Sequence, residues 1–131
     1  MEDYQAAFIE RHIDTETLSK SGRKVAAIHF GGISIECLLK AIIFASLPKD
    51  MSKDLRTHSY TALLKQNNKL KSRIDKFPEV RKWLEEVENP ISQHFIDMRY
   101  SGVEPNEAIY KSWFQAYQRL KEWLQREAPR L

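Results

Sequence analysis

The feature that most constrains this chain is one long apolar run over residues 25–47, VAAIHFGGISIECLLKAIIFASL. Wound as a helix, the run is apolar around nearly its whole circumference, which predicts a helix buried on almost every side. It is long enough to cross a membrane. However, His29, Glu36 and Lys40 interrupt it, and such polar residues argue against a span. We therefore expect the central helix of a bundle, also able to form a dimer interface, and no membrane contact.

The polar residues of this run form a single streak, since His29, Glu36 and Lys40 fall within about 40° of each other on a helical wheel. Glu36 and Lys40 are four apart and can pair on one face. A buried glutamate needs such a partner. We interpret the two residues as an internal polar seam, with Arg99 as a further predicted partner of Glu36. The alternative is that they belong to a functional site.

Most of the remaining chain also has helical character. Breakers are scarce, with 4 Gly and 5 Pro among 131 residues, and no strand-like alternation competes. The pattern predicts an all-α, antiparallel up-and-down bundle of about five helices, as a single domain over residues 1–131. Residues 48–57 are expected to form a polar loop. The expected helices are residues 4–18 after an Asp3 N-cap, 23–47, 60–74 after Thr57 or Ser59, a short one between Pro78 and Pro90, 91–100, and one from an Asn106 cap to 127.

The last of these helices is amphipathic. Its apolar residues recur at spacings of three and four, which predicts a face that packs on the core. An aromatic platform for stacking nucleobases is the alternative. The residues of the stripe are Ile109, Trp113, Ala116, Tyr117, Leu120 and Leu124, with Trp123 beside it.

Composition and motifs exclude several kinds of site. A net charge of +3, from 21 basic and 18 acidic residues, permits contact with RNA but does not demand it. The single Cys37 excludes a disulfide framework and a cysteine-rich zinc site. No phosphate loop, dinucleotide fingerprint or zinc-protease motif is present. We expect no metal and no cofactor. The small basic patches at residues 23–27 and 71–76 are interpreted as solvated faces, and the lack of a signal peptide favours the cytoplasm.

Four residues remain as candidates for chemistry. His58 lies at a loop-to-helix junction, where it is a cap, a surface residue or a base. Arg99 and Tyr100 end a helix, where Arg99 either complements the helix dipole or binds phosphate in a cleft. His94 precedes Arg99 by five residues, about 140° around a helix, so the two cannot easily share one site within a chain.

Three segments of the sequence resemble HEPN domains (higher eukaryotes and prokaryotes nucleotide-binding). SGRKVAAIHFGGISIECLLKAII resembles their second helix, through Glu36, Cys37, Leu39, Lys40 and Ala41. THSYTALL is similar to the start of their third helix, and DMRYSG to their Arg-Tyr segment. The resemblance implies an all-α up-and-down bundle that is commonly dimeric, so we expect a homodimer.

The same resemblance implies a function connected with RNA or nucleotides. The family includes metal-independent RNases, many of them toxins paired with a nucleotidyltransferase-like antitoxin, whose signature is Arg, four to six residues, then His. No His follows Arg99 at that distance. Arg23 and His29 are the sole formal match, and about 120° on one helix separates them, so we interpret it as coincidence.

We therefore expect a non-catalytic or divergent HEPN-like protein of a prokaryotic toxin–antitoxin or stress-response module. It would bind a nucleotide, RNA or a partner such as the antitoxin. The candidate ligand-binding residues are Glu36, Lys40, His58, Arg99 and Tyr100. Two alternatives stay open. One is an RNase in which Arg99 works with His58 or His94, the histidine coming from the other subunit, and the other is a pure protein-interaction module.

Overall fold

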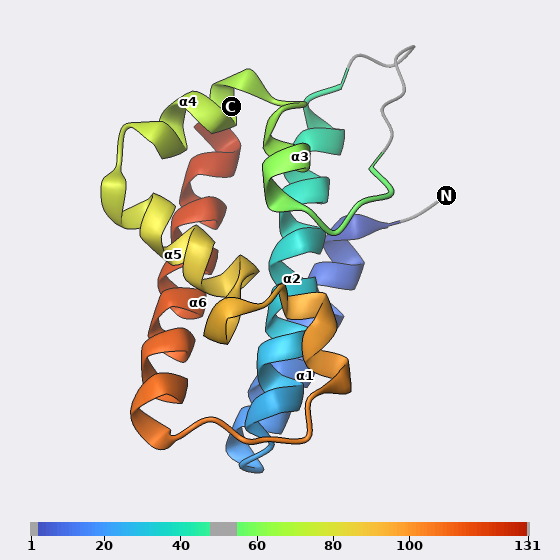
Figure 1. Ribbon diagram of the computed structural model, residues 1–131. Coiled ribbons are helices and arrows are strands. Elements are labelled where there is room, and N and C mark those ends of the chain that lie inside the picture. The colour runs from blue at the N-terminus through green and yellow to red at the C-terminus, as the bar shows by residue number, and fades with distance from the viewer. Residues whose placement is uncertain (1–2, 48–54, 131) are drawn as a thin grey trace.

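The computed structural model describes residues 3–47 and 55–130, and over these residues the chain is helical with no strand (Figure 1). The prediction of an all-α bundle is confirmed. The α-helices are α1 (Tyr4–Lys20), α2 (Lys24–Ala45), α3 (Tyr60–Leu64), α4 (Asn68–Asp75), α5 (Pro78–Glu88) and α6 (Glu107–Glu127), and the 3-10 helices are η1 (Pro90–Ser92), η2 (Phe95–Tyr100) and η3 (Ala128–Arg130).

Three long helices form the frame of the bundle. α1 and α2 are an antiparallel hairpin, turned at Gly22, whose φ of 73° is the left-handed conformation that glycine adopts without strain. α2 and α6 both rise from the lower to the upper end in Figure 1. The shorter helices α3 to α5 cross between the end of α2 and the start of η1. Residues 48–54 of the predicted polar loop lie outside the described residues.

Side-chain caps explain where several helices begin. Asp3, Ser59, Asn67 and Asn106 each accept a hydrogen bond from a backbone N–H in the first turn of α1, α3, α4 and α6. The predicted caps Asp3 and Asn106 are confirmed, and Ser59 rather than Thr57 caps α3. The cap at Asn67 divides the helix predicted over residues 60–74 into α3 and α4.

The α-helix predicted over residues 91–100 is wrong. The segment forms η1 and η2 instead, separated by two extended residues, Gln93 and His94. Pro90 has no N–H to donate, and Ile91 and Ser92 have φ values of 51° and 64°. A β-branched residue in this left-handed region is a backbone outlier, which an α-helix cannot contain. The chain therefore enters η2 at a new angle, and η2 packs against α2.

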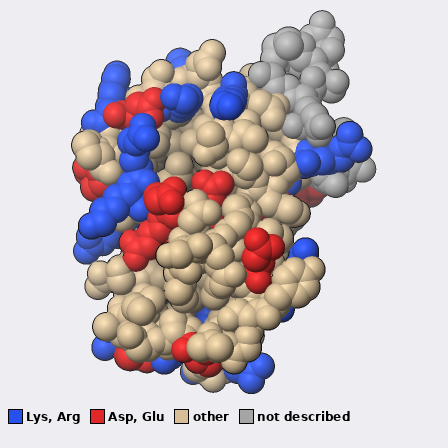
Figure 2. All heavy atoms as spheres, viewed as in Figure 1, with Lys and Arg blue, Asp and Glu red and all other residues tan. Residues whose placement is uncertain are grey.

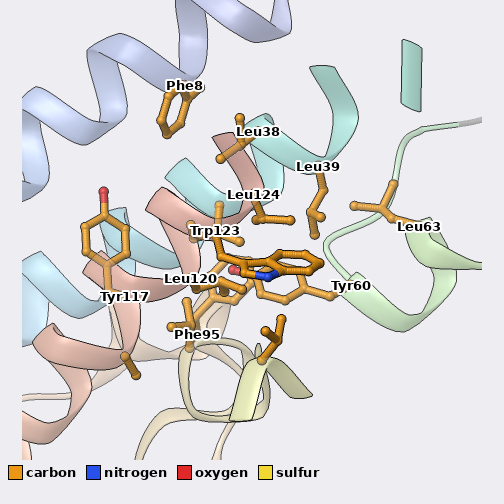
Figure 3. Close-up of a cluster of buried hydrophobic side chains, with 14 of the residues drawn as sticks. Phe8, Leu38, Leu39, Tyr60, Leu63, Phe95, Tyr117, Leu120, Trp123 and Leu124 are labelled. Atoms are coloured by element: carbon orange, nitrogen blue, oxygen red, sulfur yellow. The ribbon is translucent and has the colours of Figure 1, made fainter. Parts of the chain in front are cut away.

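α2 is the central helix, as its apolar run predicts. Trp113 of α6 and Phe95 of η2 pack directly on its two adjacent glycines. A Cβ at Gly31 would lie 2.6 Å from the Trp113 ring, and one at Gly32 would lie 2.2 Å from Cγ of Phe95. These glycines therefore permit a close approach that no larger residue allows. Figure 3 shows the surrounding cluster, including Phe8, Leu38, Leu39, Tyr60, Leu63, Tyr117, Leu120, Trp123 and Leu124.

The composition of α2 would also suit a membrane span. It is the one helix of the described chain with sufficient length and apolarity, but 67% of its most apolar window is buried inside the bundle. The core helix of a bundle has the same composition, because it too is surrounded by apolar groups.

α6 packs on the core with the predicted stripe, with one exception. Trp113, Ala116, Tyr117, Leu120 and Leu124 are buried, whereas Ile109 is 44% exposed. Its neighbour Tyr110 is buried instead and donates a hydrogen bond to Oγ of Ser19 at 2.5 Å. The exception lies in the first turn, beside the loop that leads into α6.

Candidate functional site

The polar seam in α2 is a three-residue cluster centred on a buried carboxylate. Lys40 Nζ donates to Oε2 of Glu36 at 2.7 Å, and His58 Nδ1 lies 2.7 Å from Oε1 of the same residue. The Glu36 and Lys40 side chains are only 6% and 11% exposed. The predicted pairing of Glu36 with Lys40 is confirmed. The predicted contact between Glu36 and Arg99 is not formed, because Arg99 lies at the end of η2, beside the first turns of α2.

His58 is fixed through its backbone as well as its ring. Nε2 of His94 donates to the carbonyl oxygen of His58 at 3.0 Å, and Nδ1 of His94 accepts from the backbone N–H of Ile96. These two bonds assign the proton of His94 to Nε2 and leave neither nitrogen free for acid–base chemistry. His94 is therefore structural, whereas the His58 ring is 56% exposed with Nδ1 on Glu36.

A second buried carboxylate supports the start of α3. Oε2 of Glu88 accepts a hydrogen bond from the backbone N–H of Tyr60 at 2.8 Å. Burial raises the pKa of Glu88 and raises that of Tyr60 well above the usual value for tyrosine. The Tyr60 phenol thus stays protonated and donates to the carbonyl oxygen of Gly32 at 2.6 Å. These contacts stabilise the start of α3 and its packing against α2.

A different group of candidates meets at the start of α2, in a cleft of about 440 Å³. Two arginines and a histidine line it: Arg23, Arg99 and His29. Among the described residues, neither arginine pairs with a carboxylate. We call this the α2-start cleft. Its lining residues are Arg23, Val25, Ala26, His29, Phe30, Met98, Arg99, Ser101, Gly102 and Glu104.

Local backbone geometry explains why Arg23 and His29 share this cleft. Arg23 is the N-cap of α2, with φ −89° and ψ 74°, and thus does not follow the helical spiral. The separation of about 120° expected from the sequence assumed that both residues were helical. That assumption was wrong. Arg23 is consequently the cleft residue that the sequence interpretation set aside. The separation of six positions between Arg23 and His29 was the sequence signal that could have identified it.

His29 is oriented by a main-chain contact. Its Nδ1 lies 3.1 Å from the carbonyl oxygen of Phe95, which can only accept, so Nδ1 carries the proton. In the neutral ring Nε2 is then an acceptor. The ring packs edge-on against Phe30, another residue of the cleft. The cleft therefore has a histidine of defined tautomer beside two guanidinium groups.

Arg99 and Tyr100 lie together at the edge of the cleft. The Arg99 guanidinium lies 4.7 Å from the centre of the Tyr100 ring, within range of a cation–π interaction. Tyr100 is 75% exposed. An exposed aromatic ring beside an arginine is an arrangement that suits a ligand with both a flat ring and a phosphate.

One carboxylate also lines the cleft. Oε2 of Glu104 accepts a hydrogen bond from the backbone N–H of Val25 at 3.3 Å, in the first turn of α2. Two arginines against one glutamate leave the cleft with a positive balance. No group of three His, Cys, Asp or Glu side chains in residues 3–47 and 55–130 is arranged to hold a metal ion.

A further polar network lies between α1, α2 and α6, and the sequence offered no sign of it. The Tyr117 hydroxyl lies 2.6 Å from Nδ1 of His12 and 3.2 Å from Oγ of Ser34. Nε2 of His12 pairs with Glu16 at 2.9 Å. Burial raises the pKa of Tyr117 to about 12 and lowers the pKa of His12. Because Tyr117 is fully buried, this network connects helices and does not receive ligands.

Comparisons of the chain with protein-family models, with curated proteins and with solved structures found no match. Function must therefore be inferred from the side chains of this chain.

Proposed function

We propose that this protein binds the phosphate group of a nucleotide or of RNA in the α2-start cleft. The observation that carries the proposal is that Arg23 and Arg99 line one cleft with no carboxylate partner among the described residues. A guanidinium has a planar set of donors that matches phosphate geometry, and it stays charged at any physiological pH. Two such groups converging on one cleft favour a phosphate ligand over a neutral one.

Tyr100 favours a ligand that also carries a base. Its ring is largely exposed, and Arg99 already lies against the ring. A base stacked on Tyr100 would place its phosphate beside the guanidinium of Arg99. Stacking on an aromatic side chain contributes about 1–3 kcal/mol per base and tolerates different bases. The predicted ligand residues Arg99 and Tyr100 thus form one binding unit, separate from Glu36, Lys40 and His58.

Binding of ATP and of a short single-stranded RNA tests this proposal, with titration calorimetry as the readout. We expect Arg23→Ala and Arg99→Ala each to weaken binding by about tenfold or more, the loss of a charged hydrogen bond being about 1.5–3 kcal/mol. The matched control is Arg119→Ala, which removes an exposed arginine of α6 outside the cleft. Equal affinities for all four proteins, or no binding to the wild type, would overturn the proposal.

We also propose that the bundle is HEPN-like and acts as a homodimer with an antitoxin-type partner. Two of the segments that resemble HEPN domains meet through Glu36 and His58, whose side chains are in contact at 2.7 Å. Light scattering on the purified protein tests the oligomeric state, with twice the 15.4 kDa chain mass expected. A monomer at micromolar concentration would contradict the dimer.

His29 supports a second candidate function, a metal-independent RNase. The expected histidines His58 and His94 do not line the α2-start cleft, but His29 does, together with Arg23 and Arg99. With Nδ1 donating to Phe95, Nε2 is the atom that can accept a proton from an RNA 2′-hydroxyl. The 2′-oxygen then attacks the neighbouring phosphorus, and the bond from phosphorus to the 5′-oxygen breaks to give a cyclic phosphate, the departing 5′-oxygen taking a proton from water to become a hydroxyl. The arginines stabilise the negative charge added to the phosphorus centre.

Cleavage of a fluorogenic RNA in the presence of EDTA separates this candidate from simple binding. An RNase of this kind would lose about 100-fold or more of its rate in His29→Gln, the range of general base catalysis, while RNA affinity stays close to wild type. A substrate with a 2′-deoxy linkage would be bound but not cleaved. If the wild-type protein binds RNA without cleaving it, the binding function stands and the RNase candidate fails.

A further inference from the structure

Helix α4 and the residues that flank it carry an unusually one-sided set of charges. Residues 65–76 contain five basic residues and one acidic residue, in a chain whose basic and acidic totals are 21 and 18. Figure 2 shows lysine and arginine side chains crowded at the upper left of the molecule, over the region of α4 and α5. On the helical wheel Lys69, Ser72 and Lys76 fall within about 60°. We call these three residues the α4 basic face.

The one carboxylate that α4 itself contributes is already compensated. Asp75 pairs with Lys71 at 2.9 Å and with Arg81 of α5 at 2.8 Å. These partners hold the pKa of Asp75 below its usual range, with the hydrogen bond from Lys71 as the largest cause. Asp75 is therefore ionised but surrounded by positive charge, and it does not neutralise Lys69 or Lys76.

The other basic residue of α4 is directed elsewhere. Arg73 pairs with Glu127 at the end of α6, at 3.0 Å, and its guanidinium lies 5.7 Å from the Phe77 ring centre. Lys69 and Lys76 are exposed and form no ion pair with any described residue. The face thus presents two uncompensated lysines about 10 Å apart along the axis, with the Ser72 hydroxyl between them.

The character of the face selects one class of partner. The apolar residues of α4, Leu70 and Ile74, are 0% and 2% exposed. No large hydrophobic side chain is exposed on α3, α4 or α5. A protein interface or a lipid surface would be expected to use apolar anchors. The phosphodiester backbone of a nucleic acid needs no apolar anchor. Lysines that neutralise its phosphates release the counterions condensed on it, and this release provides the binding free energy.

We propose that the α4 basic face binds the phosphodiester backbone of a single-stranded nucleic acid. The inference goes beyond the proposed function, because α4 contributes no residue to the α2-start cleft and the face would bind even if the cleft held no phosphate. Where both sites act, the ligand is a polymer rather than a free nucleotide. The basic patch at residues 71–76, interpreted from the sequence as a solvated face, is then part of a binding surface.

The test is the salt dependence of binding to a fluorescent single-stranded RNA of about 12 nucleotides, followed by anisotropy. The variant Lys69→Gln/Lys76→Gln removes two charges from the face. The control Lys111→Gln/Lys121→Gln removes two from α6, where Lys111 follows Glu107 by one turn and Lys121 lies near His12. Each lost phosphate contact lowers the slope of log affinity against log salt by about 0.7 for single strands.

We expect the slope to decrease by about 1.4 in the α4 variant, with an affinity several-fold weaker at low salt, and to stay unchanged in the control. Equal slopes in the two variants would overturn the proposal. Arg99→Ala, measured alongside, separates the two sites. RNA binding that depends on Arg99 but not on Lys69 and Lys76 contradicts only the α4 basic face. RNA binding that depends on the two lysines but not on Arg99 contradicts only phosphate binding in the α2-start cleft. Unchanged thermal midpoints confirm that all variants are folded.

Discussion

The carboxylate of Glu36 and the imidazole of His58 meet at 2.7 Å across 22 residues of sequence. The contact connects the buried face of α2 to the segment that precedes α3. Lys40 occupies the other oxygen of the same carboxylate. Glu36 is thus the centre of a polar cluster on an otherwise apolar helix, and removing it leaves a largely buried ammonium group without its partner.

Glu36→Gln should accordingly lower the free energy of unfolding by about 3 kcal/mol, because breaking one side of a buried ion pair costs about 3–5 kcal/mol and the amide keeps some hydrogen bonding. Urea denaturation followed by circular dichroism measures the change. As a control, Lys71→Gln breaks an exposed pair and should alter stability much less. Equal effects of the two substitutions would show that the Glu36 cluster behaves as a surface feature.

Gly32→Ala should destabilise the protein by about 1–2 kcal/mol. The added Cβ would lie 2.2 Å from Cγ of Phe95, and overpacking of about 1–3 kcal/mol outweighs the helix propensity gained over glycine. Gly102→Ala is the control, since a Cβ there meets nothing within 4 Å. Thermal unfolding compares the two variants, and a Gly32→Ala protein as stable as wild type would contradict the close packing of η2 on α2.

His12 should make the folded state sensitive to mild acid. Burial lowers the pKa of His12 below 6.5, aided by Lys121 and opposed by Glu16. Between the lowered value and 6.5, the unfolded chain binds more protons than the folded chain, so stability falls as the pH is lowered through this window. Above 6.5 the contribution of His12 to stability is fully present.

The variant His12→Gln should lack this component of the pH dependence. Urea denaturation at a series of pH values from about 7.5 down to about 5 gives the difference between the two proteins. A constant difference in unfolding free energy across the series would mean that His12 titrates alike in the folded and unfolded states.

Tyr100→Ala should weaken the binding of RNA more than Tyr100→Phe. The ring is 75% exposed, so its removal costs little stability, and the phenylalanine retains the face on which a base can stack. The expected loss for alanine is about 1–3 kcal/mol, or roughly 5- to 150-fold in affinity. If both variants bind as the wild type does, Tyr100 is not a stacking platform.

The sequence by itself determined the helical elements that local patterns encode. The apolar run identified α2 as the central helix, and the spacing of Glu36 and Lys40 predicted their pair. Caps at Asp3 and Asn106 located the starts of α1 and α6. Each of these features depends on residues within a few positions of one another, where helix periodicity and capping are sufficient to predict the outcome.

Only the tertiary structure decided which distant side chains meet. His58 rather than Arg99 is the second partner of Glu36. Arg99 instead lines the α2-start cleft together with Arg23 and His29. The reasons are backbone conformations that periodicity does not encode. The left-handed residues Ile91 and Ser92 interrupt the expected helix, so that only the 3-10 helix η2 forms after them. Arg23 has non-helical backbone angles, so its side chain does not point in the direction that a helical wheel predicts.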